Sequence, residues 1–240
     1  MARLALLLAV AVWLMAGPAL AQDVTISLGD DTSLSARAIQ LFILVTVLSL
    51  VPGLAVMITC FPFIVTVLAI LRQGLGLQQS PPNMLIVSLA LFLTYFVMEP
   101  VFVEAWTRGI EPLTEGAIDT ETAFFETMEP FRDFMVSRIE PTTFAALADL
   151  RPDPAPFGRD APLSVLIPAF LLSEIERAFE IGFLIFMPFL IIDLVVAAIL
   201  MSMGMMMVPP AIVALPFKLA FFVVADGWAL VSGALVRSYF

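Results

Sequence analysis

The stretch Met201-Ser202-Met203-Gly204-Met205-Met206-Met207-Val208-Pro209-Pro210 lies between two long apolar segments. Five of the chain's 13 methionines fall within seven of these residues. Gly204, Pro209 and Pro210 make the stretch a poor place for an unbroken helix. The sequence therefore predicts a cluster of flexible, polarizable side chains at the break between two membrane-embedded helices.

Two charges, Asp193 and Lys218, interrupt the apolar segments on either side of this break. Charges deep in membrane segments are costly and need partners. If the chain turns near Met205 and Met206, helical rise places both charges about 18–20 Å from the turn. They are therefore expected to pair across a helical hairpin, as a structural ion pair, as part of a proton relay, or with one of them contacting another subunit.

Two interpretations of the methionines themselves remain open. Methionine fills irregular gaps in hydrophobic cores, which is its commonest use. Met205, Met206 and Met207 are consecutive, however, and three consecutive residues cannot all face one core on a helix. If several copies surround an axis, the loop would place rings of thioethers there and could seal a pore around a passing chain.

Composition sets the fold class. The chain has 240 residues, of which 61% are hydrophobic and 13% charged, and its mean hydropathy is +1.06. These values indicate an all-α integral membrane protein. The net charge of −10 argues against a nucleic-acid partner. The absence of histidine and the single cysteine, Cys60, exclude a histidine-based triad, a histidine metal site and an intrachain disulfide, and no cofactor is expected.

The first 21 residues have the pattern of a cleavable signal peptide. Arg3 precedes an apolar run, and Ala19-Leu20-Ala21 forms a small-residue cleavage site. Cleavage would place the mature N-terminus outside the cytoplasm. Residues 22–37 follow as a polar lead-in, in which residues 24–28 alternate weakly like a short strand.

The rest of the chain divides into two predicted membrane hairpins and an insert. Residues 38–103 form the first hairpin, with breaks expected at Pro52-Gly53 and at Pro62. Residues 104–162 form a small helical periplasmic insert that holds 12 acidic residues and five arginines. Residues 163–236 form an amphipathic helix kinked at Pro168 and the second hairpin, and 237–240 form a tail. The expected fold is a set of broken, kinked helical hairpins with about four long apolar segments.

Several of these stretches resemble the FliP family. They are residues 179–195 (FEIGFLIFMPFLIIDLV), 203–210 (MGMMMVPP), 214–219 (ALPFKL), 226–228 (DGW), 81–83 (PPN) and 89–94 (LALFLT). Residues 166–170 (LIPAF) and the pair Ser173-Glu174 are also similar. The resemblance covers about residues 39–103 and 163–232.

The resemblance implies a non-enzymatic subunit of the flagellar type III protein export gate. Copies of such a protein form a pentamer and join the FliQ and FliR subunits. The assembly forms a pore for unfolded flagellar proteins in the bacterial inner membrane, at the flagellar basal body. In this family the methionine loop is a gasket, which corresponds here to Met205, Met206 and Met207, with Gly204, Pro209 and Pro210 shaping the loop. Glu174, Asp226 and Trp228 become candidate subunit contacts.

Two positions depart from the family pattern. Phe63 stands where the resemblance implies an arginine, and Glu176 where it implies a lysine after the Ser173-Glu174 pair. Alternatives to the export-gate subunit are an injectisome subunit, a membrane scaffold that lines no pore, and an ion-coupled transporter using Asp193, Asp226 and Lys218. An intramembrane enzyme finds little support, since no nucleophile and base are arranged together in the sequence.

Overall fold

A computed structural model of the chain describes residues 34–77, 80–153, 156–205 and 207–240. Within those ranges the secondary structure is helical, with no strand, which confirms the predicted all-α class. The chain divides into two compact units, Met1–Leu48 and Ser49–Phe240. The signal peptide, most of the polar lead-in and the weak strand pattern at 24–28 lie outside the described residues.

Helix α2 (Leu34–Met57) continues through Pro52 and Gly53, so the break expected there is wrong. The chain breaks instead at residues 58–60, and α3 (Phe61–Gly74) begins just before Pro62. Proline is tolerated in the first turn of a helix, where its missing N–H would have no helical partner. At the break, the Thr59 hydroxyl donates to the Val56 carbonyl at 2.7 Å.

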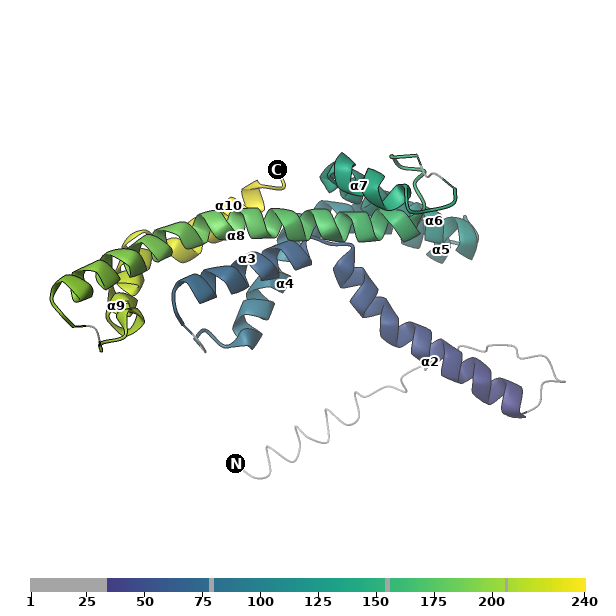
Figure 1. Cartoon of the computed structure of the whole chain (residues 1–240). Coiled ribbons are helices and arrows are strands. Elements are labelled where there is room, and N and C mark those ends of the chain that lie inside the picture. The colour runs from purple at the N-terminus through teal and green to yellow at the C-terminus, as the bar shows by residue number, and fades with distance from the viewer. Residues whose placement is uncertain (1–33, 78–79, 154–155, 206) are drawn as a thin grey trace, which may run out of the picture. The chain divides into compact units, whose positions relative to one another are not determined.

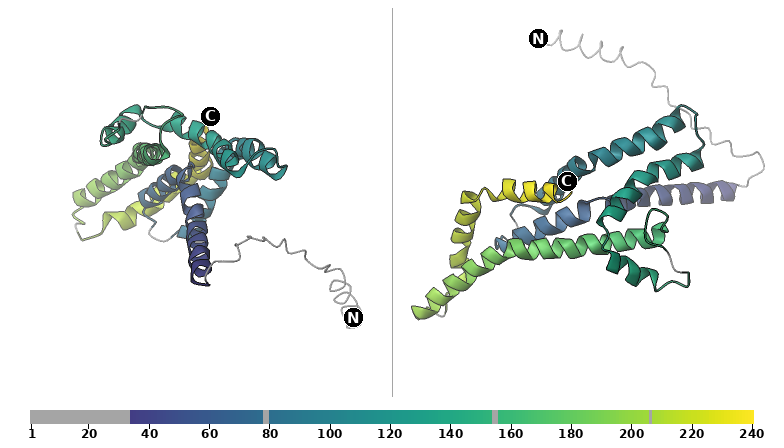
Figure 2. Two further views of the ribbon diagram at one scale, coloured as in Figure 1. Left: turned by 90° about the vertical axis from the view of Figure 1, so that its right-hand side faces the viewer. Right: turned by 90° about the horizontal axis from the view of Figure 1, so that it is seen from above.

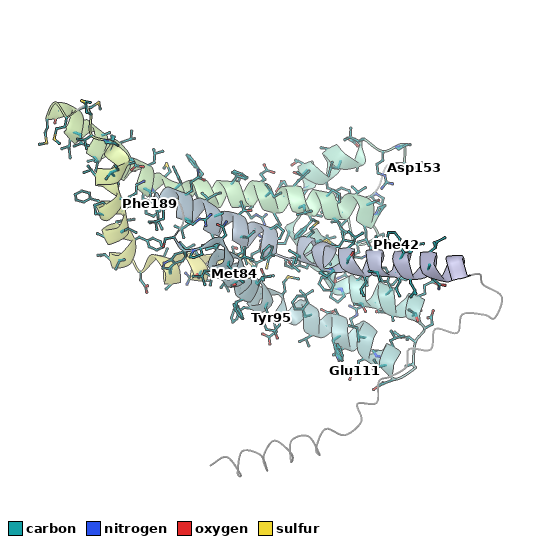
Figure 3. The ribbon with its side chains drawn as sticks, turned by 90° about the horizontal axis from the view of Figure 1, so that it is seen from below. Phe42, Met84, Tyr95, Glu111, Asp153 and Phe189 are labelled. Atoms are coloured by element: carbon teal, nitrogen blue, oxygen red, sulfur yellow. The ribbon has the colours of Figure 1, made fainter. Side chains whose placement is uncertain are left out.

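The second arm of the first hairpin and the insert follow in order. Helix α4 (Asn83–Ala105) leads through the π-helical turn η1 (Trp106–Ile110) into the short α5 (Glu111–Thr114). The insert then forms α6 (Thr120–Arg138) and α7 (Pro141–Ala148). Glu140 occupies the N-cap of α7, because Pro141 starts the helix. On α4, Met84 and Tyr95 are exposed, at 80% and 62%, and are labelled in Figure 3.

Helix α8 (Leu163–Ser202) is a single helix, whereas the sequence predicted a kinked amphipathic helix followed by a separate apolar one. It runs through Pro168 and Pro188. Figure 1 shows α8 as one continuous ribbon. Its first half forms a buried core with α6 and α7 that includes Met135, Phe144 and Phe170.

A second hydrophobic core lies where α3 packs along α8 (Figure 2). The contact is close at Gly182, where an added Cβ would lie 2.4 Å from Ile70 Cδ1. Phe63, Leu68 and Phe189 are buried in the same cluster. Helix α3 is thereby held against the helix that leads to the methionine stretch.

The chain ends in two helices that form a bent arm. Helix α9 (Pro210–Val224) and helix α10 (Gly227–Arg237) meet at an angle of 62°. Three helical stretches of the described residues are long and apolar enough to cross a membrane: Ala38–Met57, Asn83–Thr114 and Leu163–Ser202. The bent pair α9–α10 makes a fourth if it counts as one span, in agreement with the predicted four segments.

Candidate functional site

The methionine loop (residues 203–209) joins α8 to α9 and begins with a well-formed helix end. Gly204 has a φ of +73°, a left-handed conformation that favours glycine. The Met205 N–H donates to the Leu200 carbonyl at 2.9 Å, and the Gly204 N–H donates to the Met201 carbonyl at 3.1 Å. These two bonds form a Schellman motif, which ends α8 in a defined geometry. Pro209 is the N-cap of α9 and Pro210 its first residue, so both ends of the loop are fixed.

The described methionines of the loop are exposed to different degrees. Met203 is 66% exposed, Met205 42% and Met207 97%, while Met206 lies outside the described residues. Sulfur atoms gather at this end of the hairpin in Figure 3. Met207 is therefore the described loop residue that is most available to another chain.

An apolar groove lies between α8 and α9 directly below the loop. Its volume is about 490 Å³. Six of the residues that line it are Ile191, Val195, Ile199, Met203, Met205 and Phe217. Met205 thus belongs both to the loop and to the wall of the groove, which accounts for its partial burial.

Lys218 and Asp193 meet across the hairpin, as the count of helical turns predicted. Lys218 Nζ lies 2.6 Å from Asp193 Oδ2 and also donates to the Gly74 carbonyl at 3.0 Å. Lys218 is buried, whereas the Asp193 side chain is 38% exposed. The second contact was not foreseen, although the C-terminal carbonyls of a helix such as α3 regularly need a donor. Lys218 therefore joins three helices, α3, α8 and α9.

Glu174 is fully buried inside the chain, so the structure does not support its assignment as a subunit contact. Its Oε1 lies 3.0 Å from Arg138 Nε on α6, and its Oε2 accepts a hydrogen bond from the Tyr239 hydroxyl. Arg177 Nη1 lies 3.7 Å from the same carboxylate. With these three partners inside the chain, the carboxylate is enclosed rather than presented to a neighbour.

Tyr239, which the sequence placed in a plain tail, is one of those partners. Arg138 Cζ lies 4.1 Å from the centre of the Tyr239 ring, a cation–π contact. Burial, together with the neighbouring Glu174 carboxylate, raises the pKa of the Tyr239 hydroxyl far above its usual range. The hydroxyl therefore remains a proton donor to Glu174. A lone tyrosine after a terminal helix carries no sequence signal for such a contact.

Comparison with known proteins identifies the family. The model of the FliP family matches residues 44–235, which is most of the chain. The chain belongs to the FliP family. A flagellar biosynthetic protein FliP from Caulobacter vibrioides is 49% identical, over 99% of this chain and 90% of the relative. A protein of the same name from Aquifex aeolicus is 45% identical, over 84% of this chain and 86% of the relative. Another from Bacillus subtilis is 42% identical, over 88% of this chain and 96% of the relative.

The remaining candidate residues of this FliP-family chain lie at its surface. Asp226 is exposed, and Trp228 is 37% exposed with its ring 5.4 Å from that of Phe222. Both are placed where a second subunit could reach them. Glu176 is exposed and lines a polar pocket with Ser173 and Arg177.

Phe63, the other departure from the family pattern, is fully buried. Its ring packs edge-on against Tyr239 at 5.6 Å between centroids. Phe63 therefore helps to hold Tyr239, near the C-terminus, in the core. Within the described part of this FliP-family chain, no group of three or more histidine, cysteine, aspartate or glutamate side chains could hold a metal ion.

Proposed function

We propose that this chain is a subunit of the flagellar type III protein export gate and that its methionine loop seals the export pore. Membership of a family of flagellar biosynthetic proteins supports the flagellar role and favours it over an injectisome role. The observation that carries the pore assignment is the methionine loop itself. It places Met207 almost fully exposed at the tip of a hairpin whose helices are tied together by Lys218 and Asp193.

Methionine suits such a seal for two physical reasons. Its thioether is apolar, so a ring of methionines makes a constriction that water and ions enter at high cost. Its side chain has three rotatable bonds, so the same ring deforms around chains of different shape. The fixed ends of the loop, at Gly204 and Pro209, would hold the ring in place while its side chains move.

Resemblance to the FliP family supports the assembly that we propose around the loop. Several copies, by resemblance a pentamer, surround the pore together with FliQ and FliR subunits, and unfolded flagellar proteins pass through it. The complex lies in the inner membrane at the flagellar basal body, after removal of residues 1–21. The many exposed apolar residues of α4 and α8 support burial against lipid or other subunits.

Substitution of the loop methionines tests the proposal. In cells that assemble the complex, replacing Met205, Met206 and Met207 with alanine is expected to raise ion leakage. Met201→Ala is the matched control, because Met201 is 61% exposed but lies on α8 before the loop. Unchanged permeability in the triple variant, with normal assembly, would instead favour a scaffold that lines no pore.

A further inference from the structure

The end of the chain is packed into the structure through the ring of Tyr239. The ring lies between Arg138 and the aromatic rings of Phe63 and Phe134, with centroid distances of 5.6 Å and 6.0 Å to the two phenylalanines. These residues belong to α3 and α6, which are distant in sequence from the C-terminus. One aromatic side chain therefore joins the last helix to the insert and to the first hairpin.

Polar contacts accompany the ring at the same place. The Tyr239 hydroxyl donates to Glu174, and Arg138 Nη1 donates to the Ser238 carbonyl at 3.0 Å. Arg138 Nη2 is buried without a hydrogen-bond partner. Ser238 and Tyr239 thus supply two hydrogen bonds to the ion pair between Arg138 and Glu174. The Tyr239 ring also covers the Arg138 guanidinium.

The preceding break in the arm is suited to act as a hinge. Asp226 has φ 48° and ψ 48°, a left-handed conformation that aspartate adopts more readily than most residues. On its N-terminal side, α9 is fixed independently by the contacts of Lys218 with Asp193 and Gly74. Helix α10 is therefore connected to an anchored helix through a single sharp bend, and its far end is held at Tyr239.

The cost of opening this contact is moderate on physical grounds. A buried ion pair gains little net free energy, because its attraction is offset by the desolvation of both charges. Water that reached Arg138 and Glu174 would return that desolvation free energy. Opening would mainly remove the aromatic contacts of Tyr239 and the burial of Val231 and Leu235 on α10.

We propose that Ser238 and Tyr239 form a C-terminal latch, which ties the end of α10 to α6 and α8 and keeps α10 packed against α4, and whose release lets α10 turn about Asp226. The latch ties the insert to the arm that begins at the methionine loop. It does not depend on the export role, since it concerns the fold of one chain.

Thiol labelling of the full-length protein in detergent tests the latch. Leu235→Cys, in a Cys60→Ala background, places a reactive group on the buried face of α10, where Leu235 is 2% exposed. Adding Tyr239→Ala is expected to raise the rate of labelling by a water-soluble maleimide roughly tenfold, since it removes aromatic pairs and a hydrogen bond to a charged group. Tyr239→Phe, which keeps the ring, is expected to give a smaller increase.

Two controls separate opening of the latch from general unfolding. Phe240→Ala should leave the rate unchanged, because Phe240 is 78% exposed. A cysteine at Val67, which is fully buried on α3, should stay protected in the Tyr239→Ala variant. Equal labelling at Val67 and Leu235 would show that Tyr239 supports the whole fold, and continued protection of Leu235→Cys would show that it holds nothing; either result overturns the latch.

Discussion

Glu174 and Asp193 lie on the same helix, α8, and each accepts a hydrogen bond from a side chain of the C-terminal arm. Asp193 accepts a hydrogen bond from Lys218 of α9, and Glu174 accepts one from Tyr239, which follows α10. At helical rise the two acids are separated by about 28 Å along α8. The arm is therefore attached to α8 at two distant points, with the bend at Asp226 between them.

The Asp193–Lys218 pair should show unequal costs when either partner is removed. Asp193→Leu leaves the buried Lys218 cation unpaired and is expected to destabilise the protein by about 3–5 kcal/mol. Lys218→Met is expected to cost less, about 1–2 kcal/mol, because the Asp193 side chain is 38% exposed, whereas that of Lys218 is buried. Unfolding of the detergent-solubilised protein, followed by circular dichroism, measures the loss of stability in both single variants. Each variant should also assemble poorly.

The double variant Asp193→Leu with Lys218→Met completes this cycle. It removes both charges together and is expected to recover most of the loss caused by Asp193→Leu. Additive losses in the double variant would mean that the two residues act independently, and the pairing would then have no energetic role.

Gly204→Ala should destabilise the methionine loop through the backbone alone. An added Cβ would meet no atom within 4 Å, but the φ of +73° costs an alanine about 1–2 kcal/mol. Gly53→Ala is the matched control, since its Cβ would also meet nothing but its backbone is helical. Alanine at position 53 should be neutral or stabilising in thermal unfolding, and equal effects at the two sites would contradict the assigned helix end.

The crossing of α3 over α8 should be sensitive to one methyl group at Gly182. Gly182→Ala is expected to cost about 1–3 kcal/mol, because the new Cβ would overlap Ile70 Cδ1. Ile70→Val removes that atom, so the double variant should be more stable than Gly182→Ala alone. Chemical denaturation of the four proteins gives the comparison. If the double variant is no more stable than Gly182→Ala, the clash does not involve Ile70 Cδ1.

Tyr239 should make the protein sensitive to alkaline pH. Its raised pKa means that the folded state holds the phenol proton more tightly than the unfolded state does. The stabilisation is therefore complete below about pH 10, the ordinary pKa of tyrosine, and is lost as the pH rises above that value. Unfolding measured across this range should show a steeper loss of stability in the wild type than in Tyr239→Phe.

The second tyrosine provides the control for this titration. Tyr95 is 62% exposed on α4, so Tyr95→Phe should keep the alkaline loss of stability. Near-ultraviolet absorbance of the Tyr95→Phe variant reports the Tyr239 phenolate alone. Ionisation of Tyr239 at its ordinary pKa without unfolding would contradict its burial against Glu174.

Sequence reasoning succeeded where a single turn lies between regular helices. The meeting of Asp193 with Lys218 follows from counting residues on each side of the loop, because helical rise is constant. The end of α8 at Gly204 is likewise determined by neighbouring residues. Both features depend on residues within one hairpin, so the order of residues along the chain was sufficient.

Contacts between distant segments were not predictable in the same way. Arg138, Glu174 and Tyr239 come from α6, α8 and the end of the chain, and no period or spacing links them. The break expected at Pro52, and the expected separation of the amphipathic helix from the apolar helix after it, failed for another reason. Proline is a strong local signal against helix, but a long apolar helix on each side can outweigh it.

The unbroken course of α8 has a consequence for how the chain can reside in a bilayer. Its 40 residues span about 60 Å, roughly twice the thickness of the hydrocarbon layer of about 30 Å. An upright α8 would extend well beyond the hydrocarbon layer. The insert covers one face of its first half, but apolar residues such as Leu172 and Phe179 remain exposed there, and tilt alone cannot bury so large an excess. An isolated copy is therefore mismatched to any ordinary membrane, and shielding of the surplus length by protein neighbours would favour assembly.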